Sequence, residues 1–120
     1  MVCIMSLADK IRESRKVTIK IGKMSFYCDR PTEEQIRRLT ARDSTDAEFV
    51  RKMVTGFDGV KESDLFRGGD KTPVIYNKED FDEAIGDLPE IFDHLTKELI
   101  KLVTEYRDKG KELEKNSSAG

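Results

Sequence analysis

Six apolar residues recur at alternating spacings of four and three between positions 88 and 106, and this stripe restricts the fold more than any other feature. They are Leu88, Phe92, Leu95, Leu99, Leu102 and Tyr106. Residues at these spacings lie on one face of an α-helix, so the pattern predicts a helix over residues 88–108. Because the repeat is short and Lys109 interrupts it, burial in the chain's own core is favoured over a purely intermolecular coiled coil.

Two segments of alternating apolar residues predict a β-hairpin over residues 15–29. Gly22 and Lys23 lie between the segments and suit a type II′ turn, since glycine accepts a positive φ at the first central position. The expected pairs across the strands are Val17 with Cys28, Ile19 with Phe26, and Ile21 with Met24. All six side chains then share one face, which must pack on helices or on another subunit. Cys28 is therefore predicted to be a buried thiol.

Polar residues at the spacing of helix starts predict four shorter helices. Capping boxes that begin at Thr32 and Thr45 predict helices over residues 32–42 and 45–55, with Gly56 ending the second helix. The other two starts are Ser6, for a short and weakly held helix ending near Ser14, and Asn77, for a helix over residues 78–85.

These elements predict an α+β fold that is mainly α. An N-terminal β-hairpin packs on about five helices, and a long C-terminal helix contributes most of the core. Residues 1–14 form an N-terminal arm, residues 15–108 a single globular domain, and residues 109–120 a disordered tail. A chain of 120 residues lies within the usual size of one domain.

No set of residues has the spacing of a catalytic or metal site. His94 is the only histidine, and no cysteine lies near it in the sequence. The carboxylates between Asp80 and Asp87 do not match an EF-hand, and the helix dipole favours acidic residues at such a helix start. Residues 68–72 lack the spacing of a P-loop. The sequence predicts no enzyme activity, no cofactor and no metal.

Charge and hydropathy exclude two classes of partner. The chain has 22 basic and 24 acidic residues that are evenly mixed, so it lacks the basic patch on which nonspecific nucleic-acid binding depends. Its apolar runs are far shorter than the roughly 20 residues that cross a bilayer, and residues 1–5 are too short for a signal sequence. We therefore expect a cytoplasmic protein that has neither a membrane nor a nucleic acid as its partner.

Three parts of the chain together resemble the tail assembly chaperones of long-tailed (siphovirus-type) bacteriophages or prophages. The first is the opening segment 6–12, leading to the hairpin and residues 30–32. The second is the helix running into residues 54–60, in which Phe57 precedes an acidic residue and a Gly-Val pair. The third is residues 76–89, followed by the long terminal helix. The resemblance covers nearly the whole chain.

This resemblance implies a non-catalytic role in virion morphogenesis in the cytoplasm of the bacterial host. Many copies would bind the tape-measure protein, keep it soluble and help the tail-tube protein polymerise around it. Such a coat also requires self-association of its copies. Candidate partner-binding residues lie on the loop after residue 56 and along the long helix: Phe57, Val60, Leu65, Phe66, Phe92, Leu95, Leu99, Leu102 and Tyr106.

Other interpretations remain open at this point. Phe57 and Val60 also suit core residues that fix the loop, and for these two the core interpretation is favoured. The helices over residues 32–42 and 45–55 resemble a helix-turn-helix DNA-binding regulator that reads DNA with Arg51 and Lys52, although the turn has no glycine. Another minor phage morphogenesis protein would fit the same motifs.

Overall fold

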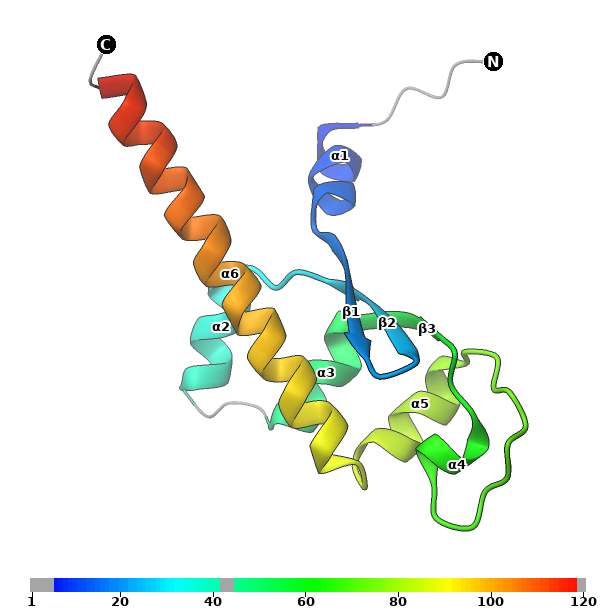
Figure 1. Ribbon diagram of the computed structural model, residues 1–120. Coiled ribbons are helices and arrows are strands. Elements are labelled where there is room, and N and C mark those ends of the chain that lie inside the picture. The colour runs from blue at the N-terminus through cyan, green and yellow to red at the C-terminus, as the bar shows by residue number, and fades with distance from the viewer. Residues whose placement is uncertain (1–5, 42–44, 119–120) are drawn as a thin grey trace, which may run out of the picture.

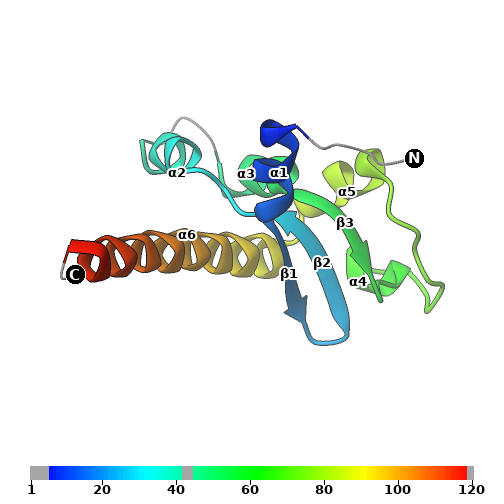
Figure 2. The same cartoon turned by 90° about the horizontal axis from the view of Figure 1, so that it is seen from above.

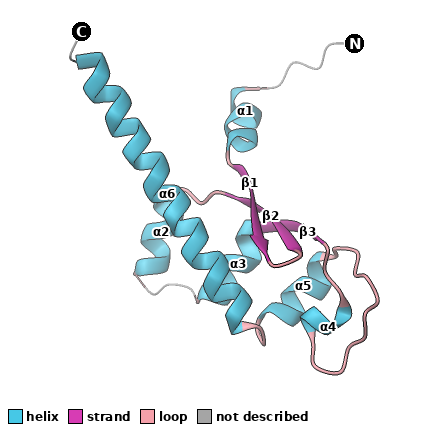
Figure 3. Ribbon diagram, viewed as in Figure 1, coloured by secondary structure: helices cyan, strands magenta, loops and turns pink. Residues whose placement is uncertain are grey.

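The computed structural model describes the backbone of residues 6–41 and 45–118, with side chains as far as residue 110. This part of the chain contains six helices and one three-stranded antiparallel sheet (Figures 1 and 3). In chain order the elements are α1 (Leu7–Ser14), β1 (Lys16–Ile21), β2 (Met24–Asp29), α2 (Glu33–Thr40), α3 (Asp46–Met53), β3 (Val54–Asp58), α4 (Glu62–Leu65), α5 (Lys78–Ile85) and α6 (Pro89–Ser118). The predicted α+β class, with an N-terminal hairpin and a long C-terminal helix, is confirmed.

The hairpin has the predicted register. Val17 pairs with Cys28, Ile19 with Phe26 and Ile21 with Met24. Gly22 at the turn has a φ of 60°, a region that glycine adopts without steric cost. The alternating pattern and the length of the turn were enough to predict this register, because a two-residue loop leaves only one register that places all the apolar residues on the same face.

A third strand was not predicted. Helix α3 ends at Met53 rather than at residue 55, and β3 begins at Val54 and pairs antiparallel with β2. Gly56 is therefore a strand residue and not the end of the helix as predicted. It lies opposite Tyr27, whose ring lies 3.3 Å from the position that a Cβ would occupy on Gly56. β-Branched and aromatic residues favour pairing with an available strand edge.

The core lies between one face of the sheet and helices α3, α5 and α6. Helices α3 and α6 pack side by side beneath the strands (Figures 1 and 2). Phe57 is central, with its ring 6.2 Å from Phe26 and 5.1 Å from Tyr76 between ring centres. The fully buried side chains include Phe26, Val50, Val60, Phe81, Ile85, Leu95 and Leu99.

Helix α6 does not end at residue 108 but continues to Ser118, through most of the segment that the sequence predicts to be a disordered tail. Gly110 destabilises a helix by only about 1 kcal/mol relative to alanine, and the Lys, Glu and Leu residues after it are good helix formers. The helix is also held to the start of α2. Arg107 donates two hydrogen bonds, of 2.7 and 2.6 Å, to the carboxylate of Glu33. The last two residues of the predicted tail, 119 and 120, lie outside the described residues.

The remaining predicted helix starts are confirmed. Thr32 and Thr45 both form capping boxes, and Ser6 and Asn77 accept hydrogen bonds as N-caps. Helix α2 covers residues 33–40 of the predicted 32–42, and residue 42 lies outside the described part. No helix in the described ranges combines the length and apolar character required to cross a membrane.

Candidate protein-binding groove

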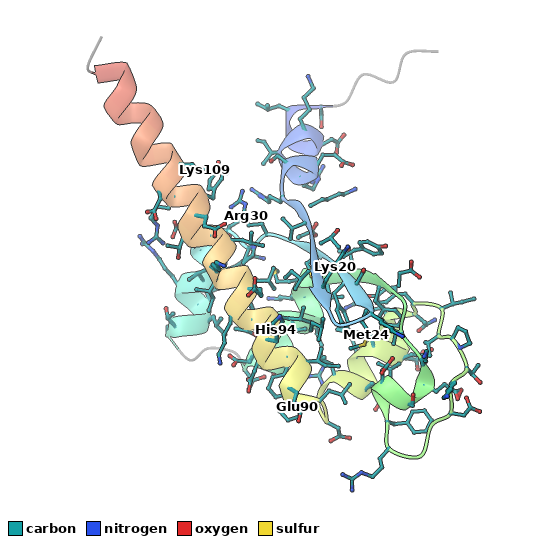
Figure 4. All side chains as sticks on the ribbon, in the orientation of Figure 1. Lys20, Met24, Arg30, Glu90, His94 and Lys109 are labelled. Atoms are coloured by element: carbon teal, nitrogen blue, oxygen red, sulfur yellow. The ribbon has the colours of Figure 1, made fainter. Side chains whose placement is uncertain are left out.

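An open groove of about 1170 Å³ lies between the hairpin turn, α4, and the connection from α5 to α6. Apolar side chains from these elements line it: Ile21, Met24, Leu65, Phe66, Val74, Ala84, Leu88 and Ile91. Figure 4 labels Met24 of the hairpin and Glu90 at the start of α6, which lie on two of its walls. The volume lies just above the roughly 300–1000 Å³ of typical small-molecule pockets, and the groove is open to solvent.

Close backbone packing at two glycines holds the α4 side of the groove in place. Gly59 has a φ of 69°, and a Cβ there would lie 2.4 Å from the carbonyl oxygen of Lys23 in the hairpin turn. A Cβ on Gly69 would lie 2.6 Å from the backbone of Glu62. Hydrogen bonds of 2.8 Å from Val74 N to Val60 O and 3.0 Å from Glu62 N to Thr72 O close the loop. The predicted loop after residue 56 therefore includes α4 and forms one wall of the groove.

The rim of the groove is acidic. Its lining includes six carboxylates and a single basic residue, Arg67; the carboxylates are Glu62, Asp64, Asp80, Glu83, Asp87 and Glu90. None of the six carboxylates forms an ion pair with a side chain that the structure describes. Charges of one sign around a low-dielectric depression attract a partner of the opposite sign. The groove therefore favours a basic, amphipathic segment.

Only two of the nine predicted partner-binding residues line the groove. These are Leu65, which is buried at its base, and Phe66, which is 54% exposed on its wall. Phe57 and Val60 are buried in the core, as the favoured interpretation expected. The sequence pattern missed most of the lining because its acidic residues have the spacing of helix caps and its apolar residues come from separate segments.

The predicted residues on α6 lie outside the groove and differ in their exposure. Leu95 and Leu99 have no exposed area, and Phe92 and Leu102 are half-buried. Tyr106 is 61% exposed, but the guanidinium of Arg30 stacks 3.8 Å from the centre of its ring. The stripe on α6 is core as far as Leu99, which confirms that this helix packs on its own domain.

His94 and Cys28 lie in different surroundings, one exposed and one buried. His94 is exposed on α6 (Figure 4). Among the described residues, no group of three or more His, Cys, Asp or Glu side chains is arranged to hold a metal ion. Cys28 is buried as predicted, and burial followed by the nearby Asp29 carboxylate raises the pKa of its thiol to about 12. A thiol with this pKa is a poor nucleophile near neutral pH.

The two basic residues of the DNA-binding interpretation, Arg51 and Lys52, lie in different surroundings. Arg51, a residue of the DNA-binding interpretation, donates a 3.0 Å hydrogen bond from Nε to the carbonyl oxygen of Asp82 in α5. Its guanidinium therefore joins two helices of the core. Lys52 lines a smaller cleft near α1, where acidic residues such as Asp29 lie beside basic ones. This mixture of charges does not form the basic stripe of a nucleic-acid interface.

Comparison with family models, with curated proteins and with solved structures found no match for this chain.

Proposed function

We propose that this protein is a non-catalytic tail assembly chaperone that binds and solubilises a tape-measure protein. The observation that carries the proposal is the open apolar groove with its acidic rim. The resemblance of segments 6–12, 54–60 and 76–89 to such chaperones supports the same role. The groove has the size and the apolar floor of a protein-binding site rather than the enclosed shape of a small-molecule site.

The chemistry of the groove defines the segment of the client protein that it would bind. An amphipathic helix places its apolar stripe in a hydrophobic groove and its flanking residues on the rim. A rim of six carboxylates and one arginine selects lysine and arginine as those flanking residues. The proposed client segment is therefore a helix of the tape-measure protein with a basic border. Covering such segments keeps the tape soluble while the tail-tube protein assembles around it.

Co-expression with the tape-measure protein encoded nearby tests the proposal. Solubility of the tape and co-purification on a sizing column are measured for the wild type and for Phe66→Asp, which places a charge on the groove wall. Ile75→Asp is the matched control, because Ile75 is 90% exposed on the same loop but does not line the groove. We expect a soluble complex with the wild type and with Ile75→Asp, and loss of the complex with Phe66→Asp.

Two results would count against this function. If the wild type neither solubilises the tape nor co-purifies with it, the chaperone proposal fails. If Phe66→Asp and the wild type give the same complex, the client binds elsewhere. Titration with duplex DNA at several salt concentrations then addresses the alternative of a DNA-binding regulator, with Lys52→Ala as the variant expected to weaken that binding.

A further inference from the structure

Helix α1 is an amphipathic helix whose apolar side is not covered by any element that the structure describes. Leu7 is 73% exposed and Ile11 is 43% exposed, and no residue of α1 is buried. The helix is nevertheless well started, since the Ser6 hydroxyl accepts a 3.1 Å hydrogen bond from the backbone of Asp9. It lies beyond the end of β1 (Figure 1), and its side with Asp9, Arg12 and Glu13 borders the smaller cleft that Lys52 of α3 also lines. A capped helix with two large apolar residues in solvent has the form of a docking segment.

The charges of α1 are arranged around this apolar side. At about 100° per residue, Lys10 lies on one border of the side formed by Leu7 and Ile11, and Arg15, the C-cap residue, lies on the other border next to the smaller cleft. Neither of these two basic residues forms an ion pair with a described side chain.

The acidic residues of α1 lie on its opposite side and already have partners. Asp9 pairs with Arg12 at 2.6 Å, and Glu13 pairs with Lys16 at 2.9 Å. The docking side of α1 is thus apolar with a basic border, which complements the apolar floor and acidic rim of the groove.

A chain cannot place its own α1 in its own groove. Helix α1 joins the first residue of β1 through Arg15 alone, whereas the groove includes Ile21 at the last residue of the same strand. The strand spans roughly 17 Å at about 3.3 Å per residue, and α1 lies beyond its far end (Figures 1 and 2). The backbone of Arg15 is fixed as well, since Arg30 N donates a 2.6 Å hydrogen bond to its carbonyl oxygen.

We propose that α1 of a second copy of this chain occupies the acidic groove. Leu7 and Ile11 of one copy then cover the groove floor of the next copy, and Lys10 and Arg15 face its rim. The contact is heterologous, because each copy supplies one arm helix and one groove, so association continues head to tail until it closes into a ring or forms an open chain.

This inference goes beyond the proposed function because it requires no tape-measure protein. The arm covers apolar surface that the free protein would otherwise expose, and a client helix of the same chemistry competes with the arm for the groove. An eight-residue helix is only about 12 Å long, so the contact is small and association is reversible and weakened by salt.

Complementary variants of the full chain test the proposal by sedimentation velocity. The arm variant carries Leu7→Asp and Ile11→Asp, and the groove variant carries Glu83→Lys and Asp87→Lys, two exposed positions. Each substitution pair is expected to weaken self-association at least about tenfold. An equal mixture of the two variants must form a one-to-one dimer and no larger species, because it retains one intact groove and one intact arm. Far-UV circular dichroism confirms that each variant is folded.

Charge reversal gives a second, independent readout. Lys10→Glu with Arg15→Glu, mixed with the groove variant, is expected to form species larger than a dimer, because the reversed arm then fits the reversed groove in addition to the retained wild-type contact, whereas Ile75→Asp alone should associate as the wild type does. A wild type that stays monomeric at high concentration would overturn the inference. Failure of the mixed variants to pair would overturn it too, because a symmetric interface or a different surface is then responsible. Loss of tape binding with intact self-association would count against the proposed function alone.

Discussion

Helices α1 and α3 are alike in their local sequence and opposite in their packing. Both have eight residues, and in both a hydroxyl residue, Ser6 or Thr45, caps the first turn next to acidic side chains. Helix α3 buries Phe49, Val50 and Met53, while α1 buries nothing. Caps and helix propensity therefore determine where each helix starts, and the neighbouring elements determine whether it belongs to the core.

The neighbours of the two helices explain the difference. Helix α3 leads directly into β3, and this connection places it against α6 and α5 beneath the sheet. Helix α1 precedes the first strand at the end remote from the groove, and no described element covers its apolar residues Leu7 and Ile11. Amphipathicity alone did not distinguish the two, because it reports that one side of a helix is apolar and not what covers that side.

The largest effect is expected when the same charged residue is placed in the core on α6 and, for comparison, on the exposed helix α1. Leu99→Asp places a charge where the side chain has no exposed area, so it should destabilise the fold by more than about 4 kcal/mol and leave the domain unfolded. Leu7→Asp introduces the same charge in α1 and should leave the melting temperature of the monomer unchanged. Thermal unfolding followed by circular dichroism measures both. A native melting curve for Leu99→Asp would show that the stripe on α6 is not core.

The second comparison concerns Gly59 and Gly22, two glycines that both have a positive φ. Gly59→Ala should destabilise by more than about 2 kcal/mol, because its Cβ would meet the Lys23 carbonyl oxygen at 2.4 Å in addition to the unfavourable φ. Gly22→Ala also places alanine at a positive φ, but no atom lies within 4 Å of its Cβ position. This variant should therefore lose about 1 kcal/mol of folding free energy. Urea unfolding of both variants gives the two values. Equal losses would mean that the hairpin turn moves away from Gly59 without difficulty.

A stabilising change is expected within the core. Among the described side chains, the Thr96 hydroxyl is buried without a hydrogen-bond partner. Thr96→Val removes this hydroxyl and should raise the free energy of unfolding by about 1 kcal/mol. Thr104→Val is the control on the same helix, since the hydroxyl of Thr104 is exposed and donates a 3.2 Å hydrogen bond to Ile100 O. A loss of stability at Thr96 would indicate an unseen partner for its hydroxyl.

The smallest effect is expected on the pH dependence of stability, through the surface pair of Glu33 and Arg107. Hydrogen bonds from Arg107 lower the pKa of Glu33 below its usual value in the folded state. A group with a lowered folded pKa contributes stability above its unfolded pKa, near 4.3, and this contribution is lost as the pH falls through the folded pKa. Arg107→Met should therefore reduce the acid sensitivity of the melting temperature slightly, while Lys109→Met leaves it unchanged. Identical pH profiles for all three proteins would show that the pair contributes nothing.

Sequence reasoning succeeded where the information is local. The register of the hairpin follows from a two-residue turn and alternating side chains, and the capping boxes at Thr32 and Thr45 are contained within four residues each. It failed at β3, because Gly56 after a helix pattern is equally consistent with a helix end and with a strand residue beneath Tyr27. The strand is formed because the free edge of β2, which is distant in the sequence, is available for pairing with residues 54–58.

The groove was harder to predict than the fold. Its lining comes from the hairpin turn, α4, the loop after it, α5 and the start of α6, and no single segment carries its pattern. Glu83, Asp87 and Glu90 have a sufficient local explanation as residues of helix ends, so their shared position around one depression is visible only in three dimensions. Leu65 and Phe66 were predicted as binding residues because large apolar side chains are unusual in an otherwise polar segment.

The C-terminal part of helix α6 extends outward from the rest of the domain. Its last described contact with another element is at Arg107, and its backbone continues as a helix to Ser118, roughly 16 Å further at about 1.5 Å per residue. A fluorophore or an added polypeptide attached after this point is thereby held at a distance from the groove and from the arm. Distances measured from such a label would report the spacing and angle between neighbouring copies in the head-to-tail arrangement proposed above.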